Sequence, residues 1–576
     1  MKKLMIYLNE YKKEAVLAPL FKLLEAFFEL LVPLVMANII DRGIADRDMG
    51  YIGRMGLCLL VLALVGLISS ITAQFFAAKA AVGFSSKLRQ ALFDHIQGLD
   101  YTNVDKAGTS TMITRMTSDI NQVQSGVNMT LRLFLRSPII VFGAMIMAFT
   151  IDVKSAMVFV AVIPLLAITV FGIMLGTRPL YRKVQERLDA VLQITRENLT
   201  GVRVIRAFHQ EDKEEEAFKE NNSALAALQM YVGRISACTN PLTYIVVNSA
   251  IIFLIYIGAI QVNAGALTQG EVVAIINYMS QILVELVKLA NLIITMTKAL
   301  ASADRVASVF DIVNEDTSYA VEGTRDGGAE GYLIFEHVSL TYSGAGGETL
   351  HDISFTANRG DTVGIIGGTG SGKTSLINLI PKFYPVTGGA IYLEGRNLMD
   401  YTDDELRAKI GVVPQKAVLF KGTVRSNMQW GKPDATDGEM WDAIDIAQAR
   451  EVVEGKDGKL DALITQNGKN LSGGQRQRLT IARALVRKPE ILILDDSVSA
   501  LDYATDAKLR AALSAAKDTM TTFIVSQRAS TIRNADMIIV LEDGEMAGIG
   551  THEELLKNCN VYQEIYYSQY PDEEKA

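Results

Sequence analysis

The chain has 576 residues, of which 49% are hydrophobic and 21% charged, and its formal net charge is −8. That length exceeds what one hydrophobic core supports, so we expect at least two domains. The acidic balance, with no basic tract to offset it, argues against a nucleic-acid-binding protein. The three cysteines lie far apart and indicate neither a disulfide framework nor a metal site.

Long apolar stretches dominate the first half of the chain. Residues 55–78 and 155–177 contain no charged side chain and are long enough to cross a bilayer as helices. We expect the third span to begin before Arg136, nearer Leu131, and residues 7–14 to form an amphipathic helix on the membrane surface. We predict six membrane spans in all, at residues 15–40, 55–78, 137–151, 155–177, 235–260 and 272–293.

The connections between these spans alternate between short and long. The two long ones, at about residues 79–130 and 178–234, carry several Lys and Arg, as does the N-terminus. The positive-inside rule places all three segments in the cytoplasm. Six spans then return the chain to the cytoplasm, so we predict that both termini and the second half of the chain lie there.

Charged residues also fall inside the predicted spans: Lys22, Glu25 and Glu29 in the first, Glu285 and Lys288 in the sixth. Intramembrane charges are costly, so we expect them to face a water-filled cavity or one another. The i,i+3 spacing of Lys22 with Glu25, and of Glu285 with Lys288, favours local pairing. An alternative hypothesis is that Glu29 attracts cationic amphiphiles.

A phosphate-binding loop opens the second half. Residues 361–366 are typical of a strand, and the loop G-G-T-G-S-G-K-T at 367–374 leads from it into a helix. Backbone N–H groups of such a loop surround a phosphate, and the helix N-terminus favours an anion. Lys373 is suited to neutralise phosphate charge and the Thr374 hydroxyl to bind Mg²⁺. We predict that ATP is bound by Gly367, Gly370, Ser371, Gly372, Lys373, Thr374 and Ser375.

Two further segments contain residues suited to bind phosphate or a metal ion. The apolar run 491–494 ends in two carboxylates, Asp495 and Asp496. About a hundred residues after the loop, a second helix N-terminus suited to phosphate begins. Its distance along the chain makes it poorly placed to serve the same nucleotide. It consists of Leu471, Ser472, Gly473, Gly474 and Gln475.

In order and spacing these motifs resemble those of ABC exporters that fuse one membrane domain to one ATPase domain. The resemblance spans the chain and implies a multidomain membrane protein of the plasma membrane. Residues 1–300 would form a six-helix all-α transmembrane domain with long cytoplasmic helical extensions. Residues 301–330 would be a linker, and residues 331–576 an α/β P-loop ATPase domain that binds ATP and Mg²⁺.

The resemblance also assigns roles to individual residues. Tyr342 matches the aromatic side chain that stacks on adenine, with a core aromatic as the alternative. Gln415 matches the glutamine that reaches Mg²⁺ and the lytic water, with an ordinary turn residue as the alternative. Asp495 matches the carboxylate that orders the water shell of the metal. Asp502 matches the loop through which two ATPase domains sense each other.

The same resemblance implies how the domains communicate. The signature at 471–475 would contact the γ-phosphate held by the opposite ATPase domain. Residues 108–121 and 200–212 resemble coupling helices that transmit closure of the ATPase domains to the membrane helices. For these two segments, a solvated helix face is the alternative.

Two positions depart from the family pattern. Asp496 stands where the family has the glutamate that acts as base for hydrolysis, and Gln527 stands where it has a switch histidine. A general base works at about 2.6–3.2 Å from its water, and the shorter side chain withdraws the carboxylate by ~1.5 Å. Glutamine cannot carry the positive charge of a histidine. We expect a site that holds ATP but splits it slowly.

Heterodimeric bacterial exporters of the multidrug type pair such a subunit with a complementary one. The resemblance therefore implies export of hydrophobic or amphipathic small molecules or peptides by a heterodimer in contact with membrane lipid. This chain would host the degenerate site, and its signature would complete the active site of the second half-transporter. The alternatives are a homodimeric exporter with slow hydrolysis, an ATP-gated regulator or channel, and an importer of metal chelates.

Overall fold

The computed structural model describes residues 2–314, 331–342, 345–516 and 519–571, and it divides the chain into two compact units. Unit 1 comprises Met1–Gly98 and Gly108–Val313. Unit 2 comprises Leu99–Ala107 and Asn314–Ala576. Most of the predicted linker at 301–330 lies outside the described residues, although a helix of unit 1 continues into its start as far as Phe310.

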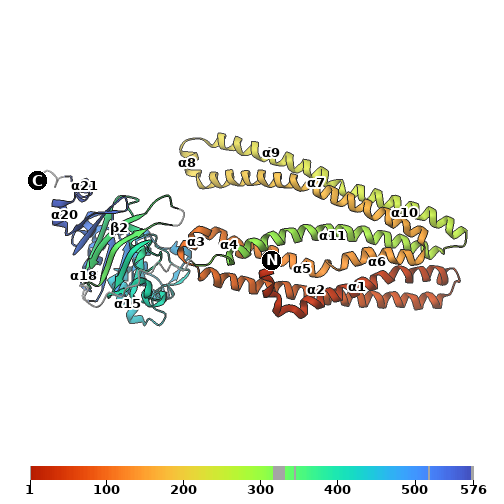
Figure 1. Cartoon of the computed structure of the whole chain (residues 1–576), viewed down its shortest axis with the longest axis horizontal. Helices are drawn as coiled ribbons and strands as arrows, with labels where there is room; N and C mark the ends of the chain where they lie inside the picture. The colour runs from red at the N-terminus through yellow and green to blue at the C-terminus, as the bar shows by residue number, and fades with distance from the viewer. Residues whose placement is uncertain (1, 315–330, 343–344, 517–518, 572–576) are drawn as a thin grey trace. The chain divides into compact units, whose positions relative to one another are not determined.

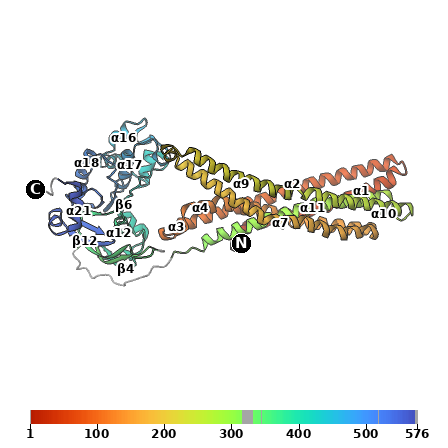
Figure 2. The same ribbon diagram turned by 90° about the horizontal axis from the view of Figure 1, so that it is seen from above.

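Unit 1 consists of helices, which run alongside one another in Figures 1 and 2. Among the described residues, six helical stretches are long and apolar enough to cross a membrane, and each contains one predicted span. The six predicted spans are thus confirmed, and the chain is a multi-pass membrane protein. The principal helices are α1 (Lys12–Asn38), α2 (Met49–Gln97), α5 (Ile120–Leu133), α6 (Arg136–Ile151), α7 (Val153–Thr200), α9 (Glu211–Ala237), α10 (Thr239–Asn263) and α11 (Gln269–Phe310).

The N-terminal 3₁₀ helix η1 (Lys2–Tyr11) packs onto unit 1. Its Leu4 side chain is buried in one apolar cluster with Phe84 and Leu88 of α2. Packing against α2 and burial of an apolar side chain account for the position of this segment within the described structure.

Arg136, the first residue of α6, joins three membrane helices. Its side chain is 7% exposed and lies 2.5 Å from Glu285 of α11 and 2.6 Å from Glu29 of α1. Glu285 accepts further hydrogen bonds from Ser137 Oγ at 2.8 Å and from Lys288 Nζ at 2.7 Å. Because a buried charge is tolerated only when it is paired and hydrogen-bonded, this network holds α1, α6 and α11 together.

The predicted local pairs are confirmed within the same network. Lys22 lies 2.5 Å from Glu25 within α1, and Lys288 lies 2.7 Å from Glu285 within α11. Arg136 adds the contacts between helices that the local spacing does not show.

Unit 2 is an α/β domain built on two main sheets. The larger has the strand order β12-β11-β3-β10-β9-β6, and it is parallel apart from β12. The smaller is antiparallel, with the order β2-β1-β4-β5. The bounds are β1 (Leu333–Leu340), β2 (Leu350–Ala357), β3 (Thr362–Gly367), β4 (Gly388–Leu393), β5 (Arg396–Asn397), β6 (Ile410–Val413), β9 (Ile491–Asp495), β10 (Thr521–Val525), β11 (Met537–Glu542) and β12 (Glu545–Gly550).

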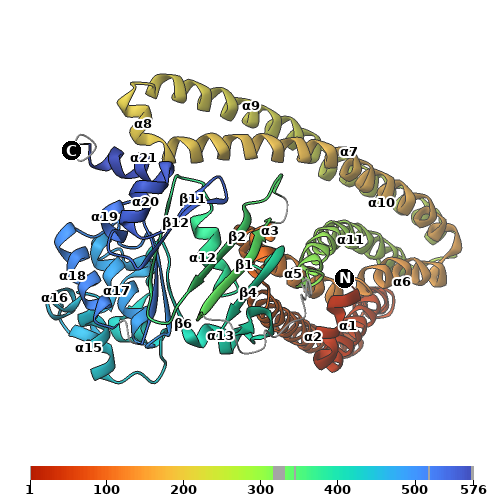
Figure 3. The ribbon, with the colours of Figure 1, turned by 60° about the vertical axis from the view of Figure 1, so that its left-hand side comes forward.

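Helices cover both faces of the larger sheet, which explains its apolar strands. Every residue of β9 and β10 is buried, as expected for parallel strands inside an α/β layer. Helix α12 (Lys373–Leu379) packs on β3, β9 and β10, beside the smaller sheet (Figure 3). Helices α17 (Gly473–Leu485) and α21 (Asn560–Gln569) contribute to the apolar cluster that also includes Leu492 and Leu494. The expected fold class is confirmed.

A short helix from the first long connection belongs to unit 2. Helix α3 (Tyr101–Ala107) places the Tyr101 ring 4.6 Å from the ring of Phe383, and Tyr384 donates a 2.6 Å hydrogen bond to Asp105. The contact thus lies just before residues 108–121, where we predicted a coupling helix. In the second long connection, α8 (Val202–Ala207) falls within the predicted segment 200–212 and buries none of its residues.

Replacing Arg136 with methionine is expected to destabilise unit 1. The change leaves Glu285 buried without its principal partner, and breaking a buried ion pair costs about 3–5 kcal/mol. Arg182→Met is the matched control, because Arg182 and Glu186 form an exposed pair worth about 0–1 kcal/mol. Thermal unfolding of both variants in lipid nanodiscs measures the difference, and equal unfolding midpoints would contradict a structural role for the network.

Candidate nucleotide-binding site

The candidate site forms where three parallel strands end side by side. Strand β3 ends at Gly367 and enters the glycine-rich loop, β9 ends at Asp495, and β10 ends at Val525. Val525 is paired with Asp495 on one side and with Ile365 on the other. The glycine-rich loop, the two carboxylates and residues 526–530, which we call the switch segment, therefore meet at one edge of the sheet, where ligands of open α/β sheets bind.

The glycine-rich loop depends on glycine for its backbone conformation and its packing. Gly370 and Gly372 have φ values of +87° and +92°, which side chains with a Cβ rarely adopt. A Cβ on Gly367 would lie 2.1 Å from the carbonyl oxygen of Leu541. Around Gly368 and Gly370, by contrast, a Cβ would meet nothing within 4 Å. The loop is therefore tied to the sheet at its start and open at its tip, as a phosphate cradle requires.

Lys373 is buried and folded back onto this loop. Its Nζ donates hydrogen bonds to the carbonyl oxygens of Gly367 at 3.0 Å and Gly368 at 2.5 Å. Burial lowers the pKa of Lys373, while the charges of Asp495 and Asp496 act in the opposite direction. The ammonium group thus sits at the loop with acceptors that phosphate oxygens can replace.

Thr374 and Asp495 form the part of the site suited to Mg²⁺. Thr374 Oγ1 lies 3.1 Å and 3.2 Å from the two carboxylate oxygens of Asp495. Burial raises the pKa of Asp495, and the hydrogen bond from Thr374 opposes that shift. A hydroxyl beside a carboxylate at the phosphate cradle is a hard oxygen donor set, which fits Mg²⁺ bound together with a nucleotide.

Asp496 occupies a strained position beside this pair. Its φ of +43° is uncommon for a residue with a side chain and is typical of functional sites. Gln415 Nε2 lies 3.5 Å from Asp496 Oδ2, so the structure brings these two predicted residues together. Burial raises the pKa of Asp496, which strengthens its carboxylate as a base.

The switch segment is held by the last described helix of unit 2. Gln527 is exposed, and its backbone carbonyl accepts a 2.8 Å hydrogen bond from Gln569 Nε2 at the end of α21. The Gln569 Oε1 atom accepts from the Ala529 backbone N–H at 2.9 Å. Arg528 Nη2 donates to the Ser499 carbonyl, which links the segment to the turn after β9. Gln569 could not be predicted from the sequence, because no local motif marks a side chain that binds a segment 42 residues away.

The other predicted residues lie around this centre or apart from it. The Tyr342 hydroxyl donates to Ser375 Oγ at 3.0 Å, so its ring lies near the start of α12. Asp502 caps α18 (Tyr503–Ser514) through the Thr505 backbone N–H at 2.9 Å. In the described ranges, no hydrogen bond joins Asp502 or the 471–475 segment to the glycine-rich loop.

The 471–475 segment forms the start of α17. Ser472 caps the helix and forms a reciprocal capping box with Gln475. Leu471 is buried, whereas a Cβ on Gly473 would meet nothing within 4 Å. A pocket of about 540 Å³ reaches from Gly473 to Gln415. The open face of this helix start can therefore accept a group from outside the unit.

Known proteins resemble the whole chain. Residues 16–286 match the family model of the ABC transporter transmembrane region, and residues 350–499 match that of the ABC transporter. An uncharacterized ABC transporter ATP-binding protein of Bacillus subtilis is 36% identical, over 99% of both chains. A putative multidrug export ATP-binding/permease protein of the same organism is 32% identical, again over 99% of both.

A solved structure supports the fold independently. A bacterial Atm1-family ABC exporter with ATP bound matches with a TM-score of 0.79 and 22% identity, covering 97% of this chain and 99% of that one. This likeness establishes an exporter-type fold of six membrane helices followed by an α/β ATPase domain.

Replacing Gln569 with leucine is expected to loosen the switch segment. The Ala529 N–H loses its acceptor, and a net hydrogen-bond contribution of about 0.5–1.5 kcal/mol corresponds to roughly two- to thirteenfold faster amide exchange. Gln563→Leu is the control, since Gln563 binds the Leu556 carbonyl in the same region at 2.8 Å without touching the switch. Hydrogen–deuterium exchange at residues 526–530 checks this, and equal exchange in both variants would refute it.

Proposed function

Because this chain belongs to the ABC transporter family, we propose that it is one subunit of a heterodimeric exporter of hydrophobic or amphipathic compounds. Its own nucleotide site holds ATP and hydrolyses it slowly, and its signature completes the active site of a second half-transporter. The assembly lies in the plasma membrane, with both termini and the ATPase domain in the cytoplasm. The relative named as a putative multidrug exporter supports this substrate class.

One contrast within the site carries the proposal. The groups that hold a nucleotide are all present: the open loop, the buried Lys373 and the Thr374–Asp495 pair. The two groups that would split it are both altered, with aspartate at 496 and glutamine at 527. A site that must hydrolyse ATP in every cycle is not expected to lack both the glutamate base and the switch histidine. A site that only holds ATP explains both.

The mechanism follows from the residues of each half-site. ATP supplies the phosphoanhydride bond whose hydrolysis drives transport. Lys373 neutralises phosphate charge, and Thr374 and Asp495 would hold Mg²⁺, which would neutralise further phosphate charge. Asp496 carries a carboxylate of adequate basicity but about 1.5 Å short of the reach of a glutamate, and a misplaced base loses much of its 10²–10⁴-fold contribution.

The signature acts on the partner's nucleotide instead. The start of α17 presents backbone N–H groups and the positive end of the helix dipole, with Gly473 open to the outside. Closure of the two ATPase domains brings this helix start to the nucleotide held by the other subunit. Closure is transmitted to the membrane helices through the coupling segments at residues 108–121 and 200–212, which exposes the substrate cavity on the outside. Hydrolysis at the partner's site resets the cycle.

Steady-state ATPase activity tests this asymmetry. We expect activity in lipid only when this chain is co-expressed with the half-transporter encoded beside it. Asp496→Asn in this chain should change the turnover of the pair by less than about twofold, because its carboxylate is not the working base. Gly473→Asp should lower turnover by about 100-fold or more, since it places a negative charge where the partner's phosphate binds.

The Gly473→Asp variant is expected to fold normally, because its new side chain enters open space and an acidic residue stabilises a helix N-terminus. High activity of this chain alone, abolished by Asp496→Asn, would establish a homodimer in which Asp496 is a working base.

A further inference from the structure

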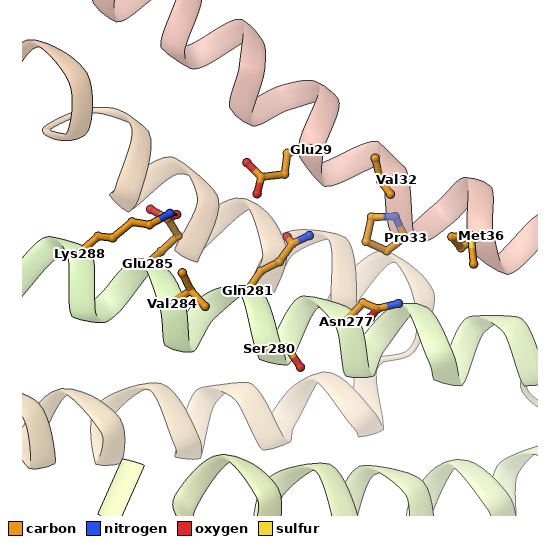
Figure 4. A pocket seen from close by; sticks show the side chains of 10 residues that line it. All are labelled: Glu29, Val32, Pro33, Met36, Asn277, Ser280, Gln281, Val284, Glu285 and Lys288. Atoms are coloured by element: carbon orange, nitrogen blue, oxygen red, sulfur yellow. Dashed lines mark hydrogen bonds and ion pairs between the residues drawn. The ribbon is translucent and has the colours of Figure 1, made fainter. Parts of the chain in front are cut away.

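A pocket of about 370 Å³ lies within unit 1 between α1 and α11 (Figure 4). Its α1 wall is largely apolar, from Val32, Pro33 and Met36. Polar side chains predominate on its α11 wall, among them Gln281 and Lys288. Its volume falls in the range of about 300–1,000 Å³ that is typical of small-molecule sites. Such a pocket can receive a ligand that is apolar at one end and polar at the other.

The charged network around Arg136 leaves one carboxylate available to this pocket. Three cations and three acids balance formally: Lys22, Arg136 and Lys288 against Glu25, Glu29 and Glu285. Glu29 is 39% exposed, against 16% for Glu25 and 3% for Glu285. Among the described residues, Arg136 is the ion-pair partner of Glu29, and it binds through Oε2. Glu29 can therefore accept a further hydrogen bond on its pocket side.

A second acceptor faces Glu29 from the other helix. The Oε1 atom of Gln281 is buried and has no hydrogen-bond partner among the described residues. Buried polar atoms are nearly always hydrogen-bonded, so this one indicates a missing donor. Figure 4 shows Glu29 and Gln281 extending from α1 and α11 into the space between the helices. Two acceptors on opposite walls call for a group with several N–H donors.

The positive charge of Lys288, which also lines the pocket, is paired with Glu285 and so repels a bound cation less. Its Nζ is bound to Glu285 Oε1 at 2.7 Å, and the same carboxylate binds Arg136. Glu285 also lines the pocket, but it is 3% exposed and is bound by both Arg136 and Lys288. Glu29 is the more exposed of the two lining acids, and it is bound by Arg136 through Oε2.

We propose that this pocket binds an amphipathic amine or guanidine, whose cationic N–H group lies between Glu29 and Gln281. Its apolar part packs against Val32, Pro33 and Met36. The assignment rests on the proposed export function, of which it specifies the substrate class. The same chemistry is offered by a soluble amphipathic amine and by the ammonium headgroup of phosphatidylethanolamine, and the experiment separates these two sources.

Binding of a matched pair of fluorescent probes tests the assignment. Dansylcadaverine carries a primary ammonium group, and its N-acetyl derivative keeps the apolar part without the charge. Both are titrated, without nucleotide, into the co-expressed transporter in phosphatidylcholine nanodiscs. We expect Glu29→Gln to weaken binding of the amine by about tenfold and Gln281→Leu by about threefold or more, as for hydrogen bonds to charged groups. Binding of the acetylated probe should be unchanged.

Matched variants separate charge from folding. Glu186→Gln removes an equivalent charge from the exposed pair with Arg182 and should leave binding of both probes unchanged. Gln281→Leu removes the side-chain amide, including the unpartnered Oε1 acceptor, and leaves the charged network intact, so it tests the pocket even if Glu29→Gln does not fold. Equal amine binding by wild type and both pocket variants would overturn the proposal, and so would a parallel loss of both probes.

The lipid composition identifies the source of the ligand. Competition when phosphatidylethanolamine is added to the nanodiscs assigns the pocket to the lipid headgroup, and its absence assigns it to soluble amines. Because binding is measured without ATP, this outcome is independent of the turnover assays on Asp496 and Gly473. Failure of the pocket assignment would leave the asymmetric ATPase cycle standing, and the reverse also holds.

Discussion

The parallel pairing of β3, β10 and β9 is the constraint on which the candidate nucleotide site depends. Parallel strands are joined by long crossovers, so the segments that follow their carboxyl ends come from distant parts of the chain and meet at one edge. In this protein that edge assembles the loop after Gly367, the carboxylates after Leu494 and the switch segment after Val525. The strands are buried on both faces, which makes their register costly to change.

The two units handle buried charge in different ways. In unit 1, Arg136 is bound by carboxylates from two other helices, and removing any partner would leave a charge in an apolar setting. In unit 2, Lys373 is bound by backbone carbonyls of its own loop. Carbonyl oxygens are neutral acceptors that a phosphate can replace with a gain in charge pairing. The first arrangement suits a fixed joint between helices, and the second suits a group that exchanges partners when a nucleotide binds.

Two structural features bear on the proposed asymmetry: the backbone around Asp496 and the contact that holds the switch segment. Asp496 has a strained backbone, and burial raises its pKa, as is typical of residues at functional sites. The switch segment is likewise retained and held by Gln569, although its side chain is glutamine. An ordered backbone around Asp496 and Gln527 is consistent with the proposal that this site binds ATP and closes on it, even if it hydrolyses ATP slowly. In the proposed heterodimer, that closed shape positions α17 on the partner's nucleotide.

The sequence by itself determined the features that depend on local chemistry. The six spans follow from long, predominantly apolar stretches, and the phosphate loop follows from glycines whose φ values only glycine adopts readily. The order of the motifs was sufficient to predict the fold class. The local pairs Lys22–Glu25 and Glu285–Lys288 followed from helical spacing.

Tertiary structure alone decided which distant residues touch. Arg136 stands at the edge of a span in the sequence, yet it contacts side chains 107 and 149 positions away. Gln569 of α21 contacts the switch segment, and α3 belongs to the ATPase unit although it lies in the first long connection between spans. Helical and strand periodicities report which face of an element is apolar, but not which element covers it. Contacts of this kind arise only when the packed helices and sheets bring separate segments together.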